Sequence, residues 1–228
     1  MKDSAKHEVT VWDLATRLFH WTLVIAVSIN LFLISPRGDL NRLIHFSVGY
    51  LVLGLLAFRL AWGFFGSPRS RFGDFLRGWA GVKQHLDSLR QRQTVHTVGH
   101  DPIGGWMIVT LIGALALMVA TGLFASDRRA SGPFAYLLSK TASNTIGDIH
   151  QLISDVLIGL IALHVLGIAT HWYLSGENLV ASMLHGRKRL PSTEAGRERP
   201  LAPGYRAVVL GALALGLAVS IAWLTGWS

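Results

Sequence analysis

The sequence predicts an all-α integral membrane protein, in which a four-helix transmembrane bundle is followed by a fifth transmembrane helix. Hydrophobic residues make up 51% of the 228 residues, and the mean hydropathy of +0.42 is too high for an ordinary soluble domain. They are gathered in blocks of about 20 residues, the length that crosses a bilayer. The basic residues lie between these blocks rather than on one basic face, which argues against nucleic-acid binding despite a net charge of +8.

The first two blocks are expected to form an antiparallel pair of helices. The first runs from about residue 14 to 34, behind Asp13 as its helix cap, and ends at a Ser-Pro-Arg-Gly turn. The second, at about 41–65, follows after only a few residues. Short connections of this kind join helices that pack side by side in opposite directions.

A basic segment separates the second block from the third. Within it, apolar residues recur every three or four positions from about residue 72 to 92. This pattern predicts an amphipathic helix on the membrane surface, and a helix packed against a partner subunit would show the same pattern.

The remaining blocks predict three further spans. The third span, at about 103–124, has Asp101 as its cap and contains no histidine, so it is interpreted as a packing helix. The fourth is expected at about 146–173, and the fifth, at about 205–227, consists mostly of Ala, Leu, Val and Gly. Residues 1–190 are thus expected to form one transmembrane domain, joined to the fifth helix by a polar linker at 191–204.

The basic residues also predict the orientation of the chain. Sixteen of the 21 Lys and Arg residues fall on the same side of the predicted spans as the N-terminus. The positive-inside rule therefore places the N-terminus in the cytoplasm and, after five spans, the C-terminus in the periplasm. No short apolar run followed by a small-residue cleavage site occurs near the N-terminus, so no signal peptide is expected.

Four histidines lie inside the predicted spans, where ionisable side chains are costly and usually functional. They are His20, His45, His150 and His164. Because His150 and His164 are 14 residues apart, they share one helix face about 21 Å apart. The alternating direction of the spans puts His45 and His150 at the outer depth, and His20 and His164 at the inner depth. For any one histidine, a hydrogen bond to a neighbouring helix is a sufficient alternative explanation.

Two pairs of histidines at two depths are what two bis-histidine haems require, because each iron takes an axial nitrogen from either face of its porphyrin. We therefore expect His45 and His150 to hold an outer haem, and His20 and His164 an inner one. The chain contains no cysteine, which excludes disulfides, iron–sulfur clusters held by thiolates and covalent c-type haem. A metal site without haem would need its histidines clustered, whereas the predicted depths divide these four into two pairs.

Three arginines are candidates for binding the haem propionates. Arg17 precedes His20, and Arg42 precedes His45, by three residues, so each lies one turn nearer the membrane surface. A guanidinium group suits carboxylates in both charge and shape. Arg59, 14 residues after His45, is placed to meet the inner haem. Contact with lipid headgroups is the alternative for each arginine.

Other site classes find little support in the sequence. No P-loop, dinucleotide-binding turn, nucleophile elbow or zinc-protease motif occurs, and no catalytic residue is assigned. A quinone is expected to bind beside the inner haem, near Arg59 and His171.

The sequence resembles the bacterial di-haem cytochrome b561 family, which is related to the cytochrome b subunits of nickel–iron hydrogenase and formate dehydrogenase. The matching stretches are VWDLATRLFHW, RLIHFSVGYLVLGLLAFRLAWGFFG, GHDPIGGWMIVTLIGALALMVATGLFASD and IHQLISDVLIGLIALHVLGIATHWYLSGENLVASMLHGRK. The resemblance implies a four-helix bundle with two b haems held by the histidine pairs above. It also implies electron exchange with the quinone pool and with a periplasmic partner, such as a c-type cytochrome or another redox subunit. The fifth helix is not covered by the resemblance.

Three functions remain open at this point. The first is an inner-membrane electron-transfer subunit of the respiratory chain, which relays electrons between quinone and a periplasmic redox protein. The second is a self-sufficient superoxide:quinone oxidoreductase. In it, electrons enter directly at the outer haem or at its basic edge, formed by Arg42, Arg128, Arg129 and Lys140. The third is a membrane anchor of a larger oxidoreductase, in which the haems serve structure or assembly.

Overall fold

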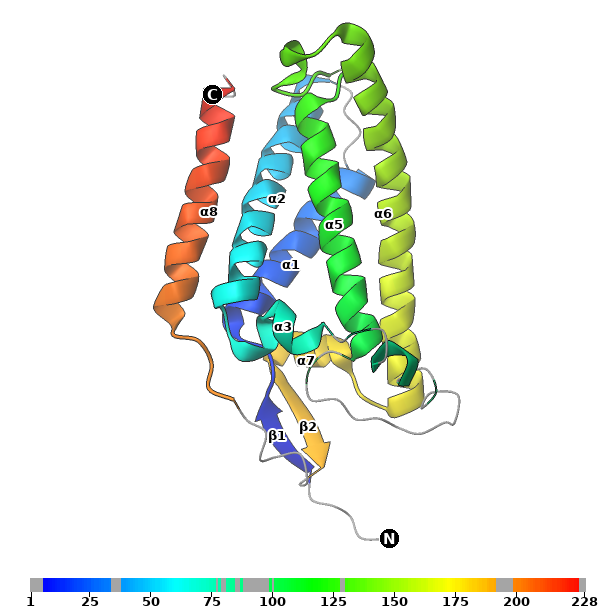
Figure 1. Cartoon of the computed structure of the whole chain (residues 1–228), viewed down its shortest axis with the longest axis vertical. Helices are drawn as coiled ribbons and strands as arrows, with labels where there is room; N and C mark the ends of the chain where they lie inside the picture. The colour runs from blue at the N-terminus through cyan, green and yellow to red at the C-terminus, as the bar shows by residue number, and fades with distance from the viewer. Residues whose placement is uncertain are drawn as a thin grey trace. The chain divides into compact units, whose positions relative to one another are not determined.

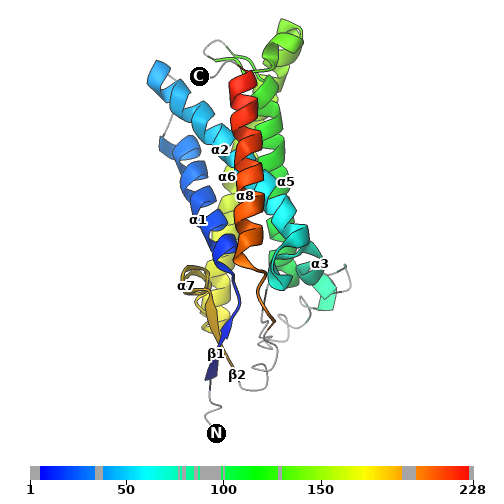
Figure 2. The same ribbon diagram turned by 90° about the vertical axis from the view of Figure 1, so that its left-hand side faces the viewer.

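The computed structural model describes residues 6–33, 38–76, 78, 81–84, 87, 99, 101–127, 130–191 and 199–225. Five helices in these ranges are long and apolar enough to cross a membrane, which confirms the predicted membrane fold. They are α1 (Leu14–Ser28, continued by a π-helical turn), α2 (Asp39–Phe65), α5 (Pro102–Phe124), α6 (Lys140–Ser175) and α8 (Gly204–Leu224) (Figures 1 and 2).

The chain divides into two compact units, and each of the long helices contributes residues to both. Unit 1 consists of the described residues within Met1–Leu18, Ala61–Val109 and Leu163–Ala207. Unit 2 consists of those within Phe19–Leu60, Thr110–Ala162 and Val208–Ser228. The contacts below are described within each unit.

Unit 2 is held together by apolar contacts between the helices. Its buried core contains residues of α1, α2, α5 and α6, namely Ala26, Val52, Leu56, Leu115 and Leu157. The fifth helix packs on α2 through small residues, because a Cβ atom at Gly54 would lie 3.3 Å from the Cβ of Ala218. Small residues let membrane helices approach closely. Tyr50 and Thr225 add a hydrogen bond of 2.9 Å between their hydroxyl groups.

The start of α1 lies in unit 1 and is built on a buried carboxylate. Asp13 is 5% exposed, and its Oδ1 accepts a hydrogen bond of 2.6 Å from the backbone N–H of Thr16, which confirms the predicted cap. Its Oδ2 accepts hydrogen bonds from Ser70 Oγ at 2.9 Å and from Trp62 Nε1 at 3.3 Å. One side chain therefore joins the beginning of α1 to the end of α2 and to the turn that follows it.

The fourth membrane helix begins earlier than the sequence predicts. α6 starts at Lys140 instead of about residue 146, behind Ser139, whose Oγ accepts a hydrogen bond of 3.2 Å from Ala142 N. The prediction followed the apolar block, and the first turns of this helix are polar. A capped polar turn is helical without showing in a hydropathy profile.

Two short strands in unit 1 add a small sheet to the otherwise helical fold. β1 (Lys6–Thr10) and β2 (Arg187–Pro191) pair antiparallel and lie side by side in Figures 1 and 2. β2 follows α7 (Leu179–His185), which ends at Gly186 with a φ of +79°. The strands were missed because they are short and charged, and because each finds its partner at the far end of the sequence.

The predicted surface helix at about 72–92 is interrupted in the part that the structure describes. A 3₁₀ turn (Pro68–Ser70) leads to the single-turn helix α3 (Phe72–Phe75), and Leu76 is extended. Residues 81–84 are helical again, and most of the rest lies outside the described residues. Gly73 and Gly78 disfavour a continuous helix here.

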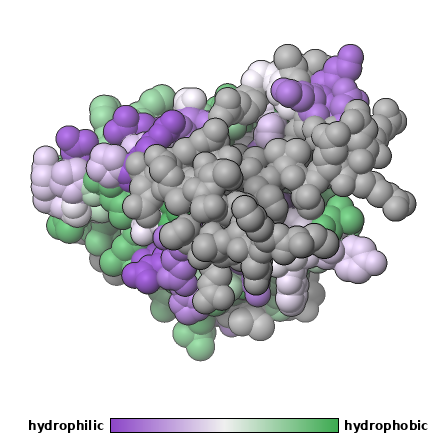
Figure 3. All heavy atoms as spheres, turned by 90° about the horizontal axis from the view of Figure 1, so that it is seen from below, coloured by the Kyte–Doolittle hydropathy of each residue, from purple (hydrophilic) through white to green (hydrophobic). Residues whose placement is uncertain are grey.

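The surface of the described residues fits a lipid environment along the spans and water at one end. Large apolar side chains of α6 and α8 are exposed, among them Leu152, Leu166 and Val208. At the end where β1 and β2 lie, hydrophilic residues gather on unit 1 (Figure 3).

Candidate functional site

Two of the four predicted ligands lie together in unit 2. His45 of α2 and His150 of α6 face each other, with ring centroids 6.4 Å apart and ring planes at 81°. A metal ion that takes one nitrogen from each of two imidazoles, at about 2 Å per bond, places the ring centres roughly 6 Å apart. The distance therefore fits two axial ligands of one iron.

The surroundings of this pair fit a haem better than a metal ion held by protein ligands alone. Among the described residues, no group of three or more His, Cys, Asp or Glu side chains is placed to hold a metal. A haem needs only two axial ligands from the protein, because the porphyrin supplies the other four. A Cβ atom at Gly49, one turn after His45, would have no heavy atom within 4 Å, which leaves room for a flat group.

The two histidine rings are held differently. Nδ1 of His150 lies 3.0 Å from Oγ1 of Thr121 on α5. Nδ1 of His45 is buried and has no hydrogen-bond partner, although the backbone carbonyl of His45 accepts a bond of 3.3 Å from Asn30 Nδ2. Thr121 was not predicted as part of the site, because α5 contains no histidine and was interpreted as a packing helix.

The other predicted pair is divided between the two units. His20 is on α1 in unit 2, where its ring packs edge-on to Trp21 at 5.0 Å between centroids. His164 is on α6 in unit 1, in the same uninterrupted helix as His150. The pairing of His20 with His164 stays a prediction.

The predicted arginines have three different surroundings. Arg17 donates a hydrogen bond of 2.6 Å to the carbonyl of Leu184 at the end of α7. Arg42 forms an ion pair with Asp39 in the first turn of α2. Arg59 is 4% exposed and lies within the membrane span of α2. Their binding of propionates stays a prediction. Of the predicted basic edge, Arg128 and Arg129 lie outside the described residues.

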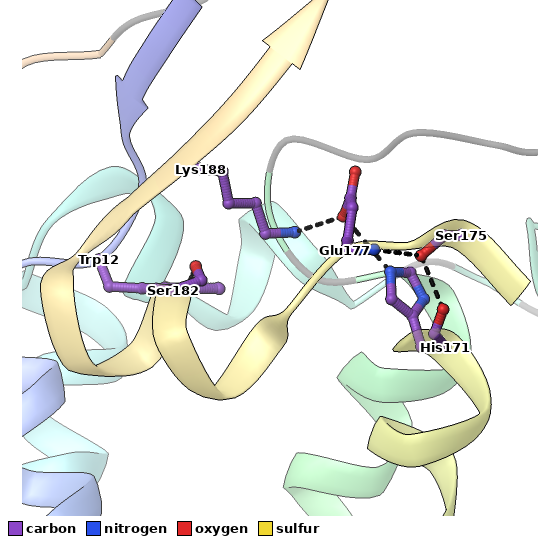
Figure 4. Close-up of polar contacts among 6 residues, drawn as sticks. All are labelled: Trp12, His171, Ser175, Glu177, Ser182 and Lys188. Atoms are coloured by element: carbon purple, nitrogen blue, oxygen red, sulfur yellow. Dashed lines mark hydrogen bonds and ion pairs between the residues drawn. The ribbon is translucent and has the colours of Figure 1, made fainter. Parts of the chain in front are cut away.

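A largely buried polar cluster occurs in unit 1 at the end of α6 (Figure 4). Nε2 of His171 lies 3.3 Å from Oε2 of Glu177, and the same oxygen lies 3.5 Å from Nζ of Lys188. The three side chains are 22%, 15% and 6% exposed. Burial lowers the pKa of Lys188, and the charge of Glu177 opposes part of that shift. Sequence reasoning singled out His171 but missed its two partners, which come together only because β2 folds back beside the end of α6.

This cluster leads to a prediction about stability. Glu177→Gln leaves the buried ammonium of Lys188 without the negative charge beside it, so we expect the variant to lose about 2 kcal/mol of folding free energy. The loss should shrink as the pH rises toward about 10, because burial lowers the pKa of the folded Lys188 below that of the unfolded chain, and the neutral amine does not need the carboxylate. Thermal unfolding in detergent at several pH values measures both effects.

The control is Glu8→Gln, which removes the carboxylate from an exposed ion pair with Arg187. Such a pair contributes less than about 1 kcal/mol. If the two variants were equally stable at neutral pH, the contact between Glu177 and Lys188 would contribute no more to stability than an exposed ion pair does.

The sequence model of the family described as prokaryotic cytochrome b561 matches residues 11–186. This range contains all four histidines of the spans and ends before α8. No curated protein and no solved structure matched the chain.

Proposed function

Because the chain belongs to the prokaryotic cytochrome b561 family, a family of membrane b-type cytochromes, we propose that it carries two b haems and transfers electrons across the membrane. The electrons pass between the quinone pool and a periplasmic redox partner, such as a c-type cytochrome. The observation that carries this proposal is the pair formed by His45 and His150, whose ring centres lie 6.4 Å apart between two membrane helices. Bound haem would supply one-electron redox chemistry at this place.

The second haem is proposed between His20 and His164. Its support is the helical spacing in the sequence, which puts His164 almost four turns beyond His150 on the same face of α6. Two haems at two depths divide the thickness of the membrane into short electron-transfer steps. Arg59, buried on α2, is proposed to bind a propionate of this haem.

The orientation and the quinone site belong to the same proposal. The N-terminus is proposed to lie at the cytoplasmic side of the inner membrane, supported by the distribution of the basic residues. Quinone reduction takes up protons, and quinol oxidation releases them. The contact between His171 and Glu177 offers ionisable groups for that exchange at the end of α6.

The most direct test is a haem count with a reduced-minus-oxidised spectrum of the purified protein. We expect two b haems per chain, both reducible by a quinol. A protein that folds correctly but binds a single haem, or none, would contradict the proposal.

The electron donor separates this function from its alternatives. If the chain relays electrons to a partner, haem reduced by quinol should be reoxidised rapidly only when a c-type cytochrome or other redox protein is added. Rapid reduction of the haems by superoxide alone would favour the superoxide:quinone oxidoreductase. Haems that exchange electrons with none of these reagents would favour the membrane anchor.

A further inference from the structure

We infer that Thr121 of α5 is a positioning residue for His150. Thr121 determines which nitrogen of the His150 ring carries the proton, and it thereby lowers the potential of the haem held there. The inference rests on the proposed function, because it takes His150 to be an axial ligand. It adds to that function a third helix, which contributes no ligand of its own but controls one.

The hydrogen bonds around Thr121 determine which nitrogen of His150 is free for a metal. Oγ1 of Thr121 lies 2.8 Å from the carbonyl oxygen of Leu117 and 3.1 Å from that of Met118. A carbonyl oxygen only accepts, so the single hydroxyl hydrogen of Thr121 points to these two atoms. The hydroxyl oxygen is then free to accept at its third contact, from an N–H at Nδ1 of His150, and this is the tautomer that we infer. This leaves Nε2 of His150 without a proton, as an axial ligand requires.

The next residue of α5 restricts the ring in a second way. A Cβ atom at Gly122 would lie 3.0 Å from Cε1 of His150, so glycine allows the ring to rest against the helix backbone. Thr121 and Gly122 therefore fix both the hydrogen bond and the position of one imidazole. The ring of His45 lacks this support, since its buried Nδ1 has no hydrogen-bond partner.

The asymmetry has a redox consequence. An imidazole that donates its N–H to an acceptor is a stronger electron donor to its metal, and partners of this kind commonly change affinity or activity 10- to 100-fold. Stronger donation favours ferric over ferrous iron. Removal of the acceptor should therefore raise the potential of the haem between His45 and His150 and leave the other haem unchanged.

The test is a redox titration of the purified, haem-loaded protein with Thr121→Val, which keeps the shape of the side chain and removes the hydroxyl. We expect one of the two potentials to rise, by a several-fold change in the ferric-to-ferrous equilibrium; a tenfold change corresponds to about 59 mV for a one-electron couple. Thr121→Ser retains the hydroxyl and should stay close to wild type. Gly122→Ala should disturb the same haem by pushing against the ring, visible in its spectrum.

A matched control is Thr145→Val on α6, because the hydroxyl of Thr145 also bonds a carbonyl four residues earlier but is exposed. It should change neither potential. If Thr121→Val empties one haem site, retention of that haem by Thr121→Ser supports the inference. Loss from both variants, or two unchanged potentials in Thr121→Val, would overturn it. Failure of His150→Ala to remove a haem would instead overturn the proposed function.

Discussion

A His150→Ala variant is expected to contain one haem per chain instead of two. Alanine removes the axial nitrogen that α6 offers opposite His45, and one remaining imidazole binds the haem much more weakly. The remaining haem, proposed between His20 and His164, is about 21 Å further along α6 and should keep its spectrum and potential. The measurements are the ratio of haem to protein and a redox titration, which should show a single component.

Two companion variants make this result specific. His45→Ala should remove the same haem, because its ring centre lies 6.4 Å from that of His150. His185→Ala, on an exposed residue at the end of α7, should keep both haems. Loss of both haems from a folded His150→Ala protein would mean that the sites are not separate, and retention of both would exclude His150 as a ligand.

Asp13→Ala is expected to destabilise the fold more than any other single change considered for this protein, by about 3 kcal/mol or more. The carboxylate caps α1 and also accepts hydrogen bonds from Ser70 and Trp62, which are 2% and 1% exposed. Alanine leaves these buried donors without an acceptor, and each one costs about 1–3 kcal/mol. Thermal unfolding in detergent, followed by circular dichroism and by haem absorbance, measures the loss.

The matched control is Asp39→Ala at the start of α2. Asp39 also lies in the first turn of a membrane helix, but its side chain is 93% exposed and its ion pair with Arg42 is at the surface. It should cost less than about 1 kcal/mol. The stability loss of Asp13→Asn should lie between those of the two alanine variants, because the amide oxygen can still accept the capping hydrogen bond. Equal melting temperatures for Asp13→Ala and Asp39→Ala would refute the importance given to the buried carboxylate.

Hydropathy determined how much of the fold could be predicted. Polar groups are costly to place in lipid, so apolar blocks of sufficient length become spans. All five spans were predicted, and for most of their ends the error was only a few residues. The start of α6 was missed by six residues because capped polar turns carry no hydropathy signal. The strands were missed because their stability depends on pairing across the whole chain rather than on local sequence.

The sequence predicted the depth of the site residues in the membrane but not how each helix is rotated about its own axis. The alternating direction of the spans placed His45 and His150 at one level, and in the structure their ring centres lie 6.4 Å apart. Which face of α5 meets His150 depends on how that helix is rotated in the bundle, and its apolar sequence offers little to fix this. Thr121 and Gly122 therefore emerged only from the structure, as did Glu177 and Lys188.

The pairing of β1 with β2 also imposes an order on synthesis. Glu8 and Arg187, whose side chains form an ion pair across these strands, are 179 positions apart. Until the ribosome has produced the first four spans and α7, the partner strand of β1 has not been made. β1 can pair only after β2 has been made, so the small sheet can close only once the part of the chain holding all four histidines has been synthesised.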